Sequence, residues 1–147
     1  MATVILNFKE KRKEKQVKFE RKVLKELSLD KLIKEVNLSF QPFLKGSLFS
    51  KAVEDGGVDV AIEAYLLGAS FGRVGHYGES FESIRMRCYY EEKYLIDTLY
   101  EYLQYWGNMG DNDFISESLY YACEQFVSKW ICEGFDKAVM RHKLRLH

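Results

Sequence analysis

Apolar residues recur at helical spacing over most of the chain. Between residues 29 and 40 they fall every three or four positions, which places them on one face of an α-helix. Ser28 precedes this segment and can accept a hydrogen bond from a first-turn N–H, so we expect it to be the N-cap. Pro42 predicts the end of this helix, because proline restricts the residue before it and has no N–H to donate.

Two longer helices are predicted in the second half of the chain. The first begins after the N-cap Ser80 and reaches about Trp106, and residues 107–112 form a loop behind it. The second begins near Asp113, and its apolar pattern continues nearly to the terminus. A continuous helix of about 30 residues would be about 45 Å long, which is long for a domain of this size. We therefore expect this helix either to break, with Gly134 as the favoured position, or to project at its basic end.

The most apolar stretch, residues 58–73, predicts a central helix. Helical projection places its small residues on one line, where a neighbouring backbone can come close. This line consists of Ala61, Ala64, Gly68 and Gly72. Before the central helix, residues 43–56 are expected to be mostly loop, and Gly56 and Gly57 to break the chain. After it, residues 72–80 are expected to form a glycine-rich turn.

The elements together predict an all-α fold: a single-domain helical bundle of four to five principal helices that spans residues 1–147. Asn7 is expected to cap a basic N-terminal helix that runs to about Leu27. The segment FKEKRKEKQ offers almost no apolar anchor, so residues 1–16 are expected to be a mobile arm, and residues 141–147 are expected to be a second one.

Charge is distributed unevenly, although the net charge is zero. Residues 9–26 hold nine Lys or Arg against four Glu, residues 27–136 hold nine against eighteen acidic residues, and residues 137–147 hold four basic residues. Both ends of the chain are therefore basic around an acidic middle. This pattern favours contact between the ends and the middle, between subunits, or with a polyanion.

Composition narrows the class of protein. Hydrophobic residues make up 47% and charged residues 30%, with one proline, which excludes collagen-like and disordered chains. Asp59, Glu63 and Arg73 interrupt the most hydrophobic stretch, so no membrane-spanning helix is expected. The three cysteines are an odd number without a Cys-x-x-Cys motif, which favours buried, reduced thiols in a cytosolic protein.

One group of residues is a candidate ligand or metal site. Asp59 and Glu63 are four residues apart on the polar strip of the central helix, so their carboxylates are neighbours that a cation would stabilise. His76 and Glu79 follow in the next turn and offer further ligand types. The alternative is structural: Asp59 suits the first turn of a helix, and Glu63 can pair with a basic residue of another helix.

Motifs for other chemistry are missing from the sequence. It has no Glu-x-x-His, which a di-iron bundle requires twice, and this argues against a ferritin-like oxidase. The glycines of residues 72–78 fit neither of the nucleotide-binding patterns. No nucleophile and base form a local motif. We therefore expect no cofactor, and the sequence leans against an enzyme.

Tyrosines and basic residues occupy different parts of the chain. Residues 9–25 and the C-terminal RHKLRLH can bind nucleic acid by charge, but aromatic residues are not interleaved with them. The tyrosines lie in the acidic middle, at Tyr89, Tyr90, Tyr94, Tyr100, Tyr102 and Tyr105. One helix cannot bury all of them against its own core, so some must lie at the surface, where tyrosine favours interfaces.

Three segments carry a resemblance to a known family. The run VDVAIEAYLLGASFGRVGHYGESFESI, the opening KEKRKEKQ and the segment VLKELS resemble the YbaK-like proteins, small uncharacterised proteins of Bacillus and its relatives. The resemblance extends over the full length. It implies a bacterial cytosolic protein and assigns no activity or site residue.

These observations support three hypotheses. The first is a non-enzymatic protein-interaction module that self-associates as a homo-oligomer, because exposed tyrosines and opposite charge blocks suit protein contacts. The second is a ligand-binding or metal-binding protein, or an enzyme, that uses Asp59, Glu63, His76 and Glu79. The third is nucleic-acid binding through the basic N-terminal helix and the C-terminal tail.

Overall fold

The computed structural model describes residues 2–43, 50–107 and 113–145. These residues form seven α-helices and one short 3-10 helix, and no strand lies among them. The elements are α1 (Ala2–Leu24), α2 (Leu29–Phe40), η1 (Gln41–Phe43), α3 (Ser50–Ala69), α4 (Gly72–His76), α5 (Phe81–Arg87), α6 (Tyr89–Gly107) and α7 (Asp113–Arg145). The predicted all-α single domain is confirmed. No helix in this part of the chain is long and apolar enough to cross a membrane.

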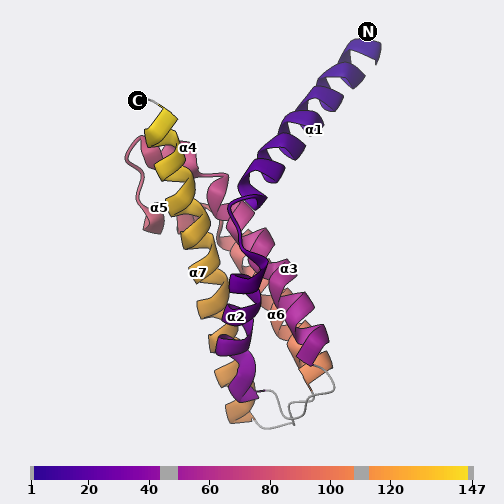
Figure 1. Ribbon diagram of the computed structural model, residues 1–147, viewed down its shortest axis with the longest axis vertical. Helices are drawn as coiled ribbons and strands as arrows, with labels where there is room; N and C mark the ends of the chain where they lie inside the picture. The colour runs from indigo at the N-terminus through magenta and orange to yellow at the C-terminus, as the bar shows by residue number, and fades with distance from the viewer. Residues whose placement is uncertain (1, 44–49, 108–112, 146–147) are drawn as a thin grey trace.

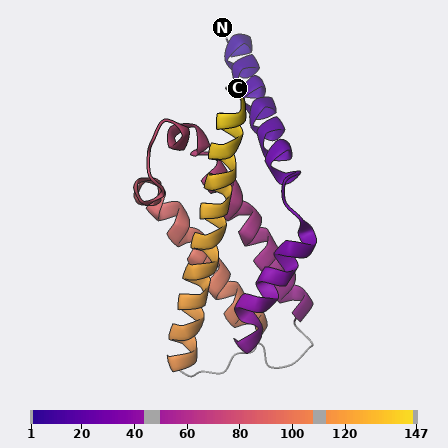
Figure 2. The same cartoon turned by 60° about the vertical axis from the view of Figure 1, so that its left-hand side comes forward.

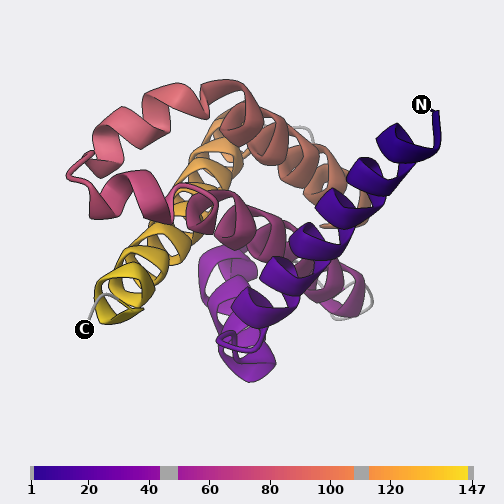
Figure 3. The same cartoon turned by 90° about the horizontal axis from the view of Figure 1, so that it is seen from above.

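Helix α3 lies at the centre of the molecule. It packs against α7, α6 and α2, which surround it in the view from above (Figure 3). Helices α4 and α5 cover one end of the bundle, where α4 contacts α7. Helix α1 projects beyond the bundle, and both chain termini lie at the same end of the molecule (Figures 1 and 2). The two basic ends of the chain are therefore on the same side of the fold.

The contact between α3 and α7 brings two backbones together. A Cβ atom at Gly68 of α3 would overlap the backbone carbonyl of Ile131. A Cβ atom at Gly134 of α7 would overlap the backbone carbonyl of Tyr65. The predicted central helix ends at Ala69, so Gly72 lies in α4, where a Cβ would overlap the side chain of Ala138. Both glycines of the small-residue line thus lie directly against α7, one from α3 and one from α4.

Large side chains fill the space on either side of this contact. Trp130, Phe40 and Leu103 are almost completely buried. The rings of Phe40 and Phe126 lie 5.2 Å apart in a tilted arrangement, which joins α2 to α7. The core therefore extends from α2 through α3 to α6 and α7.

The predicted N-caps Ser28 and Ser80 and the predicted proline stop are confirmed. The side chain of Ser28 accepts a hydrogen bond from the N–H of Lys31 at 3.4 Å, and that of Ser80 accepts one from Ser83 at 3.2 Å. Helix α2 ends at Phe40, two residues before Pro42. These signals are local, and each depends only on residues within one helical turn.

The expected break before the central helix was wrong. Helix α3 begins at Ser50 and continues through Gly56 and Gly57. A Cβ at Gly56 would overlap the ring of Tyr102, and one at Gly57 would overlap the side chain of Val36. These glycines give room to neighbouring helices instead of ending one. Of the expected loop, residues 44–49 lie outside the described residues.

The boundaries of three other predicted elements also differ. The helix expected from Ser80 to Trp106 is interrupted at Cys88, so it forms α5 and α6. The expected glycine-rich turn contains the short helix α4, and Gly78 after it has a positive φ of 104°. Helix α1 begins at Ala2, before the expected cap Asn7. The expected loop after α6, residues 108–112, lies outside the described residues.

The expected break at Gly134 is the last correction. Helix α7 is continuous over 33 residues, which corresponds to about 50 Å. Gly134 faces the carbonyl of Tyr65, so this glycine allows α7 to approach α3 closely and does not end the helix. That residues 1–16 and 141–147 are mobile stays a prediction; those of them that are described belong to α1 and α7.

Candidate interaction surface

Asp59 and Glu63 lie on the exposed side of α3, and Asp55 extends the same strip by one turn. The other sides of this helix are buried against α2, α6 and α7. The Asp55 side chain is 63% exposed and lies 3.5 Å from Lys51. The polar strip predicted on the central helix is therefore its one solvated side.

Exposed tyrosines of α6 lie beside the Glu63 end of this strip. The side chains of Tyr90 and Tyr94 are 81% and 70% exposed, although large apolar rings are usually covered. They line a groove of about 410 Å³ between α3 and α6. Its lining consists of Glu63, Leu67, Tyr90, Glu91, Tyr94 and Leu95. The groove thus combines partly buried leucines with carboxylates and tyrosine rings.

Tyr102 shows how near the carboxylates of α3 are to α6. Its hydroxyl donates a hydrogen bond of 2.7 Å to the carbonyl of Ala52. Burial raises the pKa of Tyr102, and the negative charges of Asp55 and Asp59 raise it further. We name this surface the acidic tyrosine face. It comprises Asp55, Asp59, Glu63, Tyr90, Glu91 and Tyr94.

The other two residues of the predicted ligand group have different neighbours. The ring of His76 stacks on that of His142 of α7, with 6.3 Å between ring centroids. Glu79 forms an ion pair of 2.8 Å with Arg87 and accepts a hydrogen bond of 2.8 Å from Ser83. Glu79 therefore tethers the start of α5 to its end.

No metal cluster is found where the structure describes the chain: no three His, Cys, Asp or Glu side chains there are grouped to hold an ion. Asp59 and Glu63 share one face of α3, whereas His76 contacts α7 and Glu79 contacts α5. Binding of a ligand by these four residues stays a prediction.

A second groove contains an ion pair that the sequence did not predict. Arg85 donates two hydrogen bonds to Glu92, of 3.3 and 3.0 Å, and these raise the pKa of the guanidinium. Glu92 is 7% exposed and is the buried acid of a groove of about 660 Å³ that α5, α6 and α7 line. In the sequence, the separation of seven residues, two helical turns, was the one sign that Arg85 and Glu92 face the same side. The helix break at Cys88 lies between these two residues.

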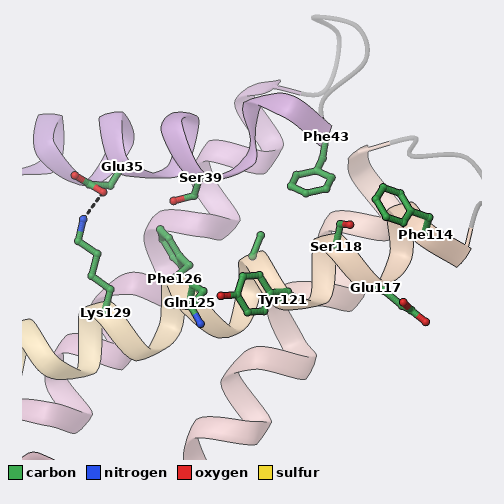
Figure 4. Close-up of a pocket in the computed structure, with 11 residues that line it drawn as sticks. Glu35, Ser39, Phe43, Phe114, Glu117, Ser118, Tyr121, Gln125, Phe126 and Lys129 are labelled. Carbon is green, nitrogen blue, oxygen red and sulfur yellow. Dashed lines mark hydrogen bonds and ion pairs between the residues drawn. The ribbon is translucent and has the colours of Figure 1, made fainter.

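A third groove lies between α2 and the start of α7 (Figure 4). It has a volume of about 720 Å³, and the side chain of Phe126 lies in it between the two helices. An ion pair of 2.6 Å between Lys129 and Glu35 lies at one end. Phe43 and Phe114 lie at the other end (Figure 4). This groove therefore follows the line where α2 packs against the start of α7.

The thiols are unsuited to nucleophilic chemistry. Burial raises the pKa of Cys123 to about 12 and that of Cys88 to about 11. Burial also raises the pKa of the less buried Cys132, followed by the charge of Asp136. Since the thiolate is the nucleophile, these cysteines are almost fully protonated at neutral pH.

Helix α1 has one anchored end and a long exposed part. Val23 is fully buried. Glu26, just after the helix, accepts a hydrogen bond of 3.3 Å from the Tyr65 hydroxyl and lies 2.9 Å from Arg141. In contrast, every side chain over residues 10–18 is exposed. The basic block therefore extends into solvent from a fixed base.

Comparison with known proteins places the chain among proteins of unknown function. The family model described as "Protein of unknown function (DUF2521)" matches residues 1–147. The "Uncharacterized protein YbaK" of Bacillus subtilis (strain 168) is 35% identical over 145 residues, which cover 97% of each chain. The resemblance to the YbaK-like proteins is thereby confirmed. No solved structure matches the chain.

Proposed function

The chain belongs to the DUF2521 family of proteins of unknown function, and we propose that it acts as a helical protein-interaction module that self-associates. One observation carries the proposal: a single chain exposes both a projecting basic helix and a face of carboxylates and tyrosines. Surfaces of opposite charge attract a second copy and orient it. Exposed tyrosines add contact area at low entropic cost.

The polar composition of α1 supports this proposal. An isolated helix of this length is marginal in water, and most helices are stabilised by packing one side against a core. Among the side chains that the structure describes in α1, residues 10–24, the packing on the core comes from Phe19 and Val23, near the C-terminal end. A partner along the exposed part would stabilise the remaining turns. A helix that bridges between two bodies has this polar composition.

The mass in solution tests the proposal. We expect analytical ultracentrifugation to give a species of at least twice the 17.3 kDa chain, with a population that grows with protein concentration. The association should weaken as salt is added, because exposed charges are screened beyond about 10 Å at 0.1 M salt. A mass of one chain at every concentration and at low salt contradicts the proposal.

A small cationic ligand is the second candidate, because Glu63 and Glu91 line a groove with two exposed tyrosines. Carboxylates and aromatic rings together bind ammonium groups. This candidate keeps Glu63 of the predicted ligand group. Titration with tetramethylammonium, followed by NMR, should shift the signals of Tyr90 and Tyr94. Signals that do not move rule the candidate out.

Nucleic acid is the third candidate, because the exposed lysines of α1 also suit a polyanion. Arg141 of the C-terminal tail pairs with Glu26, so its charge is already partly neutralised. A short DNA duplex should then bind at low salt and dissociate steeply as salt is added. Absence of binding at low salt dismisses this candidate.

A further inference from the structure

The lysines of α1 form a continuous stripe. Lys11, Lys15, Lys18 and Lys22 are spaced by four, three and four residues, so they point to one side of the helix. All four are exposed, and the stripe is about 16 Å long. Phe19 and Val23 point to another side and pack on the bundle. We name these four residues the lysine stripe.

The acidic tyrosine face offers a matching receptor. Asp55, Asp59 and Glu63 repeat every four residues along α3 and cover about 12 Å. The groove at the Glu63 end of this strip is lined by two partly buried leucines and by the exposed rings of Tyr90 and Tyr94. Lysine is suited to such a surface, because its aliphatic stem covers apolar area and its ammonium group remains at the carboxylates or over a ring.

These two surfaces do not meet within one chain. Helix α1 extends away from the bundle in both side views (Figures 1 and 2). Its base is fixed by the burial of Val23 and by the contacts of Glu26 with Tyr65 and Arg141. The exposed part of α1 is therefore available to a second molecule.

Building on the proposed self-association, we infer that α1 of one copy docks along the groove between α3 and α6 of a second copy. The lysine stripe then lies over Asp55, Asp59 and Glu63, and Tyr90 and Tyr94 cover the lysine stems. Each copy carries both surfaces, so a reciprocal exchange closes a two-fold dimer. Complementary charge and spacing select this occupant over an unrelated apolar helix.

Reversing the charge of either surface tests the inference. One variant carries Lys15→Glu, Lys18→Glu and Lys22→Glu; the other carries Asp55→Lys, Asp59→Lys and Glu63→Lys. Each variant alone places like charges together, so we expect its self-association to weaken by about tenfold or more. Mixed in equal amounts, the two variants have opposite charges at both contacts. We expect the mixture to form a dimer as stable as the wild type.

A matched control separates position from total charge. The substitutions Lys31→Glu, Lys34→Glu and Lys137→Glu change the net charge by the same amount as the three substitutions in α1. They lie at exposed positions outside both surfaces. We expect this control to dimerise like the wild type. Circular dichroism and thermal melting establish that each variant is folded. A milder variant, with alanine at the three lysines of α1, gives a second reading with less repulsion.

The outcomes distinguish the inference from the proposed function. A wild-type monomer overturns both. A wild-type dimer that neither charge reversal weakens leaves self-association standing and overturns the docking site. Weakening without recovery in the mixture shows that the two surfaces do not face each other, and equal weakening by the control assigns the effect to net charge. Each of these two results also overturns the docking site.

Discussion

Two regions of the molecule are stabilised in different ways: the contact between α3 and α7, and the helix α1. At Gly68 and Gly134 the backbones of two helices are so close that neither position has room for a Cβ atom. Helix α1 is held at one end, by Val23 and Glu26, and is exposed over residues 10–18. The first region is densely packed through small residues. The second, over residues 10–18, is polar and exposed to solvent.

This difference separates stability from interaction within one chain. Substitutions at the dense contact displace whole helices, because protein interiors leave no space to absorb added atoms. Substitutions on the exposed part of α1 remove little buried area, so they change stability little. That part of the surface can therefore be mutated to test binding without unfolding the protein.

The largest expected effect is at the dense contact. We expect Gly134→Ala to lower the free energy of unfolding by about 3 kcal/mol, because the added methyl group overlaps the carbonyl of Tyr65. Helix propensity alone predicts the opposite sign, with a gain of about 1 kcal/mol. Urea unfolding decides between them. Lys137→Ala, at an exposed position of the same helix, is the control and should change the value by less than about 0.5 kcal/mol.

A smaller effect is expected at the base of α1. Val23→Ala should cost about 2 kcal/mol, because this side chain is fully buried. Val17→Ala is the matched control in the same helix, where the side chain is 43% exposed. We expect it to cost less than about 0.5 kcal/mol by the same urea measurement. Equal costs at the two positions would mean that α1 is supported along its whole length.

The smallest effect is expected where α4 meets α7, a region of intermediate packing. Burial lowers the pKa of His142 from its ordinary value of 6.5, and the charges of Arg145, His76, Arg141 and Arg73 lower it further. As the pH falls through the ordinary pKa of 6.5, His142 binds a proton in the unfolded chain before it does so in the folded one. The free energy of unfolding therefore decreases as the pH falls. The decrease should be shallower in His142→Gln. Parallel curves for the two proteins between about pH 7 and pH 5 contradict this prediction.

The fold class and two of the three helix caps could be predicted, because they depend on local patterns; the third, Asn7, lies inside α1. Ser28, Ser80 and Pro42 act within one turn, and the sequence places each of them correctly. The breaks could not be predicted in the same way. Glycine at position 57 or 134 lowers helix propensity, so the sequence predicts a break there. In the folded chain each glycine lies against another helix at a distance that leaves no room for a Cβ atom, so the helix continues.

The candidate site was only partly accessible from the sequence. The spacing of Asp59 and Glu63 was enough to place both on one exposed strip of α3. The spacing did not show that Tyr90 and Tyr94, about 30 residues later, lie beside Glu63 in one groove. His76 and Glu79 looked like partners by proximity in sequence, but they contact His142 and Arg87.

The sequence by itself therefore determined the all-α class, the caps Ser28 and Ser80 and the opposite charges of the ends and the middle, because periodicity and charge are properties of single segments. The tertiary structure decided which glycines are contacts, which tyrosines line a groove and that α1 projects. These features depend on which segments become neighbours, and the packing of several helices at once selects those neighbours.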